Sequence, residues 1–285
     1  MTLIEYKKIF LKSLSALYTP EEAYSIFKIL IQERLGLDAA EIILSHSQKL
    51  TEPLFTSLTN DLTRLTNGEP IQYVTGKTLF YQLPFFLNNK VLIPRPETEE
   101  LVQWIIDYAK SSSDKPLKVL DIGTGSGCIS ISLKKNIPNS QLTAMDISEA
   151  ALELAQKNAI INKTIINFIQ LDVLNTHKLP EKYHIIVSNP PYVSEREKKQ
   201  MHTNVLNHEP DIALFVKNSN PLVFYDKIGD LAWKYLHPNG VLFFEINQYL
   251  SQETKILLKN KGFSAIVIKK DFLGNDRLIR AVKKV

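Results

Sequence analysis

The feature that most constrains the fold is a regular alternation of short apolar strands with amphipathic helices from about residue 97 to the C-terminus. Strands that are separated by helices pair in parallel, because a parallel pair needs a long crossover connection. The last two strands are joined by a short loop around Leu273-Gly274-Asn275, so we expect them to pair antiparallel. The predicted strands are residues 117–123, 140–148, 167–173, 183–189, 241–246, 264–271 and 276–284, and the predicted helices include 125–136 and 221–236. The sequence therefore predicts an α/β fold with helices on both faces of the sheet.

The first strand of this region runs into a glycine-rich segment, "DIGTGSG" (residues 121–127). Glycines allow a tight turn and let a ligand approach the backbone N–H groups at the start of the next helix. The G-x-G-x-G spacing differs from the G-x-G-x-x-G of dinucleotide-binding proteins, so a pyrophosphate is not the favoured ligand.

Carboxylates end the first three strands of this region, at Asp121, Asp146 and Asp172. Asp146 follows the last glycine by about 20 residues, the separation at which a carboxylate bonds ribose hydroxyls in nucleotide-binding folds. Asp172 and Val173 are placed to hold and cover an adenine. Because parallel strands end at one edge of the sheet, these residues predict an adenosine-shaped crevice. The alternative is that Asp146 and Asp172 only cap the following helices.

The fourth strand stops at "SNPPYV" (residues 188–193), where two prolines cannot donate to a sheet ladder. The side-chain oxygen of Asn189 and the carbonyl oxygen of Pro190 are two rigidly held acceptors, which suit an –NH₂ group with two donors. Tyr192 offers a flat ring against which a planar amide or base can pack. This corner predicts transfer of a methyl group from a sulfonium to an amide or aryl nitrogen, by positioning and electrostatics. The alternative is a turn that happens to contain two prolines.

The N-terminal third has a different pattern. Residues 1–70 show helical stripes, with a helix start at Thr19-Pro20-Glu21-Glu22 and a stop at Gly36. Residues 71–96 are rich in aromatic and β-branched residues, and Asn88-Asn89 predicts the turn of a linking β-hairpin. We therefore expect a helical domain at 1–70, a hairpin linker at 71–96 and the α/β domain at 97–285.

Composition narrows the classes of protein. The net charge of +4 is mild and the lysines are scattered, which argues against direct nucleic-acid binding. Cys128 is the single cysteine, which excludes an intramolecular disulfide, and no cluster has metal-ligand spacing. The N-terminus is amphipathic, unlike a signal peptide, and no apolar run reaches the length of a membrane span. We expect a cytoplasmic monomer that needs no metal.

Several blocks resemble the peptide chain release factor N5-glutamine methyltransferases. The G-x-G-x-G loop followed by Asn-Pro-Pro-Tyr is similar to the wider group of S-adenosylmethionine-dependent amino methyltransferases. The narrower resemblance lies in "NGEPIQYVTGKTLFYQLPFFLNNKVLIPRPETEELV" (67–102), "NHEPDIAL" (207–214), "EINQ" (245–248) and "DFLGNDRLIRAV" (271–282). It implies a seven-stranded Rossmann-like domain behind a small helical substrate-recognition domain. It also implies methylation of the glutamine in the Gly-Gly-Gln motif of class 1 release factors, which modulates translation termination.

The resemblance also implies roles for individual residues. Asn189, Pro190 and Tyr192 would be catalytic. The glutamine would contact these three residues with Pro191, Arg95 and Glu97. S-adenosylmethionine would be held by Asp121, Gly123, Thr124, Gly125, Ser126, Gly127, Asp146, Ile147, Asp172, Val173 and Asn189. For "IPRPETE" (93–99), the start of a capped helix explains the residues equally well.

Departures from the family pattern leave some points open. The loop at 215–225 lacks the usual glycine-rich stretch, Asn247 replaces a usual glycine, and Val173 stands where a larger residue is common. Two alternative functions remain at this point: a nucleic-acid base methyltransferase that uses the same corner, and a cofactor-binding module without catalysis. The sequence does not select among release factors.

Overall fold

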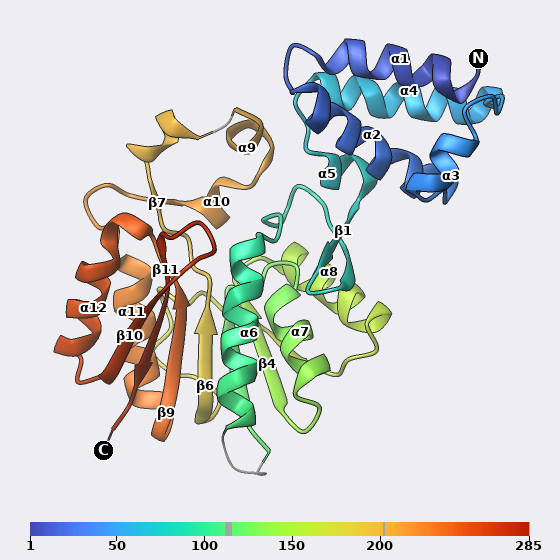
Figure 1. Cartoon of the computed structure of the whole chain (residues 1–285). Helices are drawn as coiled ribbons and strands as arrows, with labels where there is room; N and C mark the ends of the chain where they lie inside the picture. The colour runs from blue at the N-terminus through green and yellow to red at the C-terminus, as the bar shows by residue number, and fades with distance from the viewer. Residues whose placement is uncertain (112–115, 202, 285) are drawn as a thin grey trace. The chain divides into compact units, whose positions relative to one another are not determined.

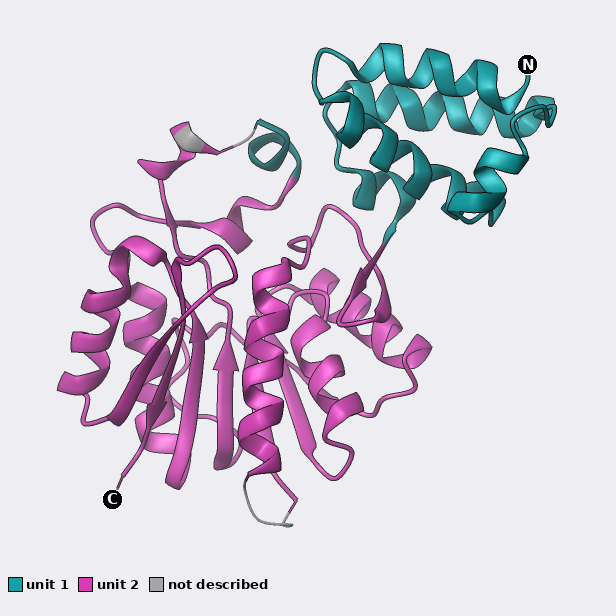
Figure 2. Cartoon of the chain, viewed as in Figure 1, with its two compact units in different colours: residues 1–77, 202–208 teal, residues 78–201, 209–285 magenta. Residues whose placement is uncertain are grey.

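The computed structural model describes residues 1–111, 116–201 and 203–284 (Figure 1). The chain divides into two compact units (Figure 2). One contains residues 1–77 together with the segment that carries α9 (Thr203–His208), and the other contains residues 78–201 and 209–285. Among the described residues, no helix combines the length and apolarity needed to cross a bilayer.

The larger unit is built on a seven-stranded sheet in the order β10-β11-β9-β6-β3-β4-β5. Its strands are β3 (Lys118–Ile122), β4 (Gln141–Asp146), β5 (Asn167–Gln170), β6 (Tyr183–Ser188), β9 (Leu236–Glu245), β10 (Ser264–Lys270) and β11 (Asp276–Val282). The strands from β9 to β5 pair in parallel, and β11 pairs antiparallel with both β9 and β10. The predicted α/β fold with a final antiparallel hairpin is confirmed.

Helices cover both faces of this sheet, as Figure 1 shows. Successive residues of a strand point to opposite faces, so Ile185 and Val187 of β6 join one core cluster and Ile186 joins the other. The first cluster packs under α6 (Pro96–Lys110) and α7 (Cys128–Asn136), and the second under α11 (Val223–Tyr235) and α12 (Ser251–Asn260). The remaining elements of this unit are α8 (Glu149–Ile161), α10 (Asp211–Leu214), β7 (Val193–Ser194), β8 (Phe215–Val216), η1 (Glu197–Gln200) and η2 (Gln248–Leu250).

The predicted hairpin exists, but its turn is not at Asn88-Asn89. Strands β1 (Lys77–Phe80) and β2 (Leu83–Phe86) pair, and Tyr81 and Gln82 form the turn with φ of 49° and 61°. Turns of this kind favour asparagine and glycine, so Tyr-Gln gives no turn signal in the sequence. Contacts with α6 hold the turn: the backbone N–H of Tyr81 donates to Glu99 (2.8 Å), and its hydroxyl donates to Gln103. Contacts with α6 therefore stabilise a turn that the residues at 81 and 82 do not favour by themselves.

The smaller unit is helical and extends past residue 70. It contains α1 (Leu3–Leu14), α2 (Pro20–Leu35), α3 (Ala39–Leu44), α4 (Glu52–Thr66) and α5 (Ile71–Thr75). The carbonyl oxygen of Val74 accepts from both Arg34 and Arg64 at 3.1 Å. Because these arginines lie on α2 and α4, they fasten α5 to the helical unit. Residues 71–76, which the sequence assigned to the linker, thus lie in the helical unit.

Candidate active site

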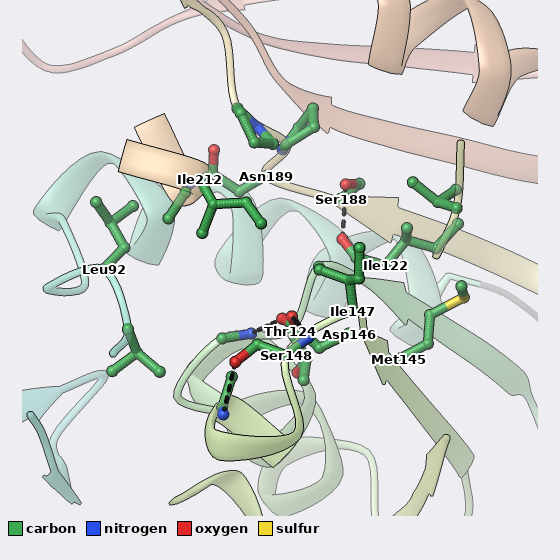
Figure 3. Close-up of a pocket in the computed structure, with 18 of the residues that line it drawn as sticks. Leu92, Ile122, Thr124, Met145, Asp146, Ile147, Ser148, Ser188, Asn189 and Ile212 are labelled. Carbon is green, nitrogen blue, oxygen red and sulfur yellow. Dashed lines mark hydrogen bonds between the residues drawn. The ribbon is translucent and has the colours of Figure 1, made fainter. Parts of the chain in front are cut away.

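A cavity of about 250 Å³ lies at the carboxyl ends of β3, β4 and β6 (Figure 3). The residues that follow β5, the loop before α6 and the start of α10 also line it. Of the residues predicted to bind ligands, the cavity is lined by Gly123, Thr124, Gly125, Ser126, Asp146, Ile147, Asp172, Val173, Asn189, Pro190, Pro191 and Arg95. The sheet therefore brings together the glycine segment and the Asn-Pro-Pro corner, because β3 and β6 are adjacent and parallel.

The glycine segment follows β3 and leads into α7. Gly125 has a φ of 56°, and a Cβ added there would meet no atom within 4 Å. The left-handed backbone and the open space beside it explain why glycine suits this position. Gly127 differs, because a Cβ there would come within 2.9 Å of Ile131 and 3.1 Å of Ala155. It does not line the cavity but lets the loop pack closely onto α8.

Asp146 ends β4 and lines the cavity. Its Oδ2 accepts from the backbone N–H of Gly125 (2.8 Å), and its Oδ1 accepts from that of Ser148 (3.0 Å). The carboxylate thus fixes the glycine loop and keeps further acceptor capacity. Burial raises the pKa of Asp146, against the opposing effect of these N–H groups.

Asp172 and Val173 follow β5 and line the same cavity. Asp172 accepts from the backbone N–H of Leu174 (2.8 Å) and from the side chain of Asn175 (2.6 Å). The chain continues from Asp172 into a turn at residues 173–175, and the described residues between β5 and β6 contain no helix. The alternative that Asp172 caps a helix is therefore wrong: its bonds hold a turn in the cavity wall.

Asp121 lies behind the glycine segment, away from the cavity lining. Its Oδ2 accepts from Thr124 Oγ1 (2.6 Å) and from the backbone N–H of Ser130 (3.2 Å). Its Oδ1 is buried and receives no hydrogen bond from the described residues. Burial raises the pKa of Asp121 to about 6. A buried acceptor without a donor is costly, so this oxygen opposes the stability of the fold.

The Asn189 corner is held by side chains from α6 and β9. Thr98 Oγ1 donates to Glu245 Oε2 (2.6 Å), and Asn189 Nδ2 donates to Thr98 Oγ1 (3.3 Å). Tyr192 Oη donates to Glu245 Oε1 (3.1 Å). Tyr192 is therefore tied to a buried carboxylate and does not line the cavity. Burial raises the pKa of Glu245, while its hydrogen bonds and the charge of Arg277 act in the opposite direction.

A long-range ion pair holds another side of the cavity. Arg95 donates to Glu209 Oε1 (2.5 Å), whose side chain is 1% exposed, and Glu209 Oε2 accepts from the backbone N–H of Ile93 (3.3 Å). Ile212 and Ala213, three and four residues after Glu209, line the cavity. Glu97 does not line it. It lies in the first turn of α6, where a carboxylate is favoured by the helix dipole.

Sequence reasoning gave no individual role to Thr98, Glu209 or Glu245. All three lie in blocks that carried the family resemblance, at 67–102, 207–214 and 245–248. A buried acid inside an otherwise apolar strand, as in "VLFFEI", is a signal that could have identified Glu245, because an acid is rarely buried without a partner.

Comparison with known proteins decides the family. The model of the PrmC N-terminal domain matches residues 9–76, and that of the methyltransferase small domain matches residues 107–214. A release factor glutamine methyltransferase of Flavobacterium psychrophilum is 47% identical over 281 residues, which cover 98% of this chain and 99% of that protein. The chain belongs to the release factor glutamine methyltransferase family. A family member from Bacteroides thetaiotaomicron is 41% identical over 95% of this chain and 96% of its own length.

Solved structures agree on the fold of this family member. A methyltransferase from Pyrococcus furiosus has a TM-score of 0.54 and 18% identity, and it covers 80% of this chain and 100% of its own. The Thermus thermophilus 16S rRNA N2 G1207 methyltransferase has a TM-score of 0.53 and 19% identity over 73% of this chain and 50% of its own. The chain therefore has the methyltransferase fold predicted from its sequence.

Proposed function

We propose that this chain transfers a methyl group from S-adenosylmethionine to the N5 side-chain nitrogen of the glutamine in the Gly-Gly-Gln motif of class 1 release factors. Family membership supports the substrate. The observation that carries the reaction type is that the glycine segment and the Asn189 corner line one cavity. A methyl donor bound along one wall would face an amide bound at the other.

The side of the cavity that carries the glycine segment fits the cofactor. Asp146 would accept from the ribose hydroxyls, and Asp172 with Val173 would hold and cover the adenine. The backbone of residues 123–127 and the buried Asp121 carboxylate would stabilise the cationic amino acid part, and Ile147 and Asn189 would complete the site. When bound, the cofactor supplies an electrophilic methyl group on a sulfonium.

The Asn189 side would position the glutamine. The Asn189 Oδ1 atom and the Pro190 carbonyl oxygen would accept the two hydrogens of the side-chain amide, and the proline ring restricts the backbone that carries the carbonyl. Pro191 lines the cavity beside them, and Tyr192 keeps the corner in place through Glu245. Arg95 would contact the substrate from the opposite wall, with Glu97 in the helix turn next to it.

The chemical step follows from this arrangement. The lone pair of an amide nitrogen is delocalised, so the nitrogen is a poor nucleophile. Two fixed acceptors orient the nitrogen toward the methyl group and stabilise the positive charge that develops on its hydrogens. The new N–C bond would form as the S–CH₃ bond breaks, which leaves neutral S-adenosylhomocysteine as the product. With the two acceptors in place no strong general base is needed, and the proton released from the nitrogen would pass to water.

We assign recognition of the release factor to the helical unit, with a single copy of the chain in the cytoplasm as the working enzyme. Both units would then act on one substrate, the helical unit on the body of the release factor and the cavity on its glutamine.

The test is incubation of the chain with labelled S-adenosylmethionine and a purified class 1 release factor, followed by mass spectrometry of the Gly-Gly-Gln peptide. We expect one methyl group on the glutamine and none on a release factor in which that glutamine is asparagine. Label on ribosomal RNA in place of the protein would support the base methyltransferase alternative. Absence of label in every acceptor would support a binding module without catalysis.

A further inference from the structure

A buried chain of hydrogen bonds connects β9 to the Asn189 side chain. Glu245 and Thr98 are 1% and 2% exposed, and they come from β9 and from the first turn of α6. The bond from Thr98 Oγ1 to Glu245 Oε2 is short, at 2.6 Å, as expected for a hydroxyl donating to a carboxylate. The bond from Asn189 Nδ2 to Thr98 Oγ1 is longer, at 3.3 Å.

The direction of these bonds follows from the number of hydrogens when Glu245 is ionised. A carboxylate can only accept, so the Thr98 hydroxyl gives its one hydrogen to Glu245, and the same oxygen can only accept from a third group. The Asn189 atom that faces Thr98 must therefore be the NH₂ nitrogen. Because the two ends of a carboxamide point in different directions, the Oδ1 atom is turned away from Thr98. Asn189 and Thr98 both line the cavity.

We propose that Thr98 and Glu245 are positioning residues that hold the Asn189 carboxamide with its oxygen toward the substrate amide. This inference rests on the proposed function, because orientation matters only if Asn189 must accept a hydrogen bond. An inverted carboxamide would present NH₂ to NH₂, which removes one acceptor and places two donors against each other. Glu245 also accepts from Tyr192, so one carboxylate fixes both ends of the Asn-Pro-Pro-Tyr segment.

The decisive comparison is between Thr98→Val and Thr98→Ser. Valine keeps the shape of threonine without the hydroxyl, and serine keeps the hydroxyl. We expect Thr98→Val to lower kcat by about 10- to 100-fold, since a misplaced acceptor weakens transition-state stabilisation. Thr98→Ser should retain most of the turnover. The dissociation constant of S-adenosylmethionine, measured by calorimetry, should change less than about threefold in both.

A matched control separates orientation from general packing. Thr254 on α12 is also fully buried, and its hydroxyl donates to the carbonyl oxygen of Leu250. Thr254→Val removes a buried hydroxyl from the same unit at a place that does not line the cavity. It should lower stability about as much as Thr98→Val does and leave kcat unchanged.

A second readout does not depend on any substrate. In protein labelled with ¹⁵N-asparagine, the Asn189 side-chain signals can be assigned by their disappearance in Asn189→Ala. The Nδ2 protons should exchange slowly with solvent in the native chain and in Thr98→Ser, and rapidly in Thr98→Val. Glu245→Gln, whose amide can donate to Thr98, should also shift these signals and lower kcat.

Three results would overturn the proposal. They are full turnover in Thr98→Val, equal losses of kcat in Thr98→Val and Thr98→Ser, and Asn189 Nδ2 protons that exchange as slowly in Thr98→Val as in the native chain. Failure of the proposed function looks different. In that case the native chain would leave release factors unlabelled while the Asn189 signals still responded to Thr98→Val.

Discussion

The cavity has two walls that are held by different kinds of contact: the glycine wall (residues 123–126 with Asp146 and Asp172) and the Asn189 wall (residues 189–191 with Thr98). On the glycine side, the bond between Gly125 and Asp146 joins residues 21 positions apart, and it links a loop to the next strand. On the Asn189 side, Asn189 and Thr98 are 91 positions apart, and Thr98 and Glu245 are 147 apart. One wall is set by local backbone geometry, and the other by side chains that the completed fold brings together.

This difference separates what each wall can do. Backbone N–H groups are placed by the chain itself, and a carboxylate accepts at either oxygen, so neither needs a partner that selects which end faces the ligand. A carboxamide that must present its oxygen needs partners that dictate its rotation. We therefore expect substitutions on the glycine side to change cofactor affinity, and substitutions on the Asn189 side to change turnover.

The largest expected effect is that of Asn189→Ala. Loss of the acceptor should lower kcat by about 100- to 1,000-fold, the range seen when one donor is removed from an oxyanion hole. The cofactor should bind within a few-fold of its native affinity, because the glycine side is intact. Single-turnover methylation of the release factor and calorimetry measure the two quantities.

The matched control for Asn189→Ala is Asn260→Ala, an exposed asparagine at the end of α12. It should leave both quantities unchanged. Near-native turnover in Asn189→Ala would refute the two-acceptor model. A loss of cofactor affinity as large as the loss of kcat would show that the Asn189 wall also binds the cofactor, against the proposed division of roles.

Asp146→Ala tests the opposite wall. The substitution removes acceptors for two backbone N–H groups and for the ribose, so the cofactor should bind about 10- to 100-fold more weakly, since each hydrogen bond to a charged group contributes about 1.5–3 kcal/mol. At saturating cofactor, kcat should fall much less. A large loss of kcat with unchanged affinity would mean that Asp146 acts on the chemical step.

The same division explains how far the sequence could predict the structure. The positions of the strands along the chain and the glycine wall follow from local signals: apolar runs, glycines and strand-end acids close together in the sequence. The adjacency of β6 and β3 follows from the general rules of parallel α/β sheets. These rules were sufficient to place Asn189 and the glycine segment at one edge of the sheet.

Long-range partners gave no such signal. In the sequence, Thr98 is typical of the first turn of a helix, and its contact with Glu245 depends on how α6 packs on the sheet. The turn at Tyr81-Gln82 was missed for the same reason, because Glu99 and Gln103 stabilise a backbone that the local sequence does not favour. Local patterns identify elements, whereas side-chain networks appear only after the elements are packed.

Asn247→Gly probes the outer support of the Asn189 wall. Asn247 Nδ2 donates to the carbonyl oxygen of Tyr192 (3.1 Å) and to Glu197 (3.0 Å), and its Oδ1 accepts from the N–H of Tyr249 (2.9 Å). Glycine loses these bonds and gains backbone freedom, so the free energy of unfolding should fall by about 1–3 kcal/mol. Turnover should fall only a few-fold, because Thr98 and Glu245 remain. Urea denaturation and kinetics measure both, and unchanged stability would show that the bonds contribute nothing.

The smallest expected effect concerns the charge behind the glycine wall. Burial raises the pKa of Asp121 to about 6 in the folded chain, above the value of 3.8 expected for an exposed aspartate. The folded state therefore binds the proton more tightly than the unfolded state does, and this contribution to stability is complete below about pH 4 and lost as pH rises through about 6.

In Asp121→Asn, the free energy of unfolding should decline less steeply over that pH range. Part of the decline should remain, because the pKa of Asp146 is also raised. Bound S-adenosylmethionine should flatten this decline more in the native chain than in Asp121→Asn, because its cationic ammonium favours the ionised carboxylate. Urea denaturation from pH 4 to pH 7, with and without cofactor, measures both slopes. An equal effect of the cofactor on the slopes of the two proteins would show that its positive charge does not act on Asp121.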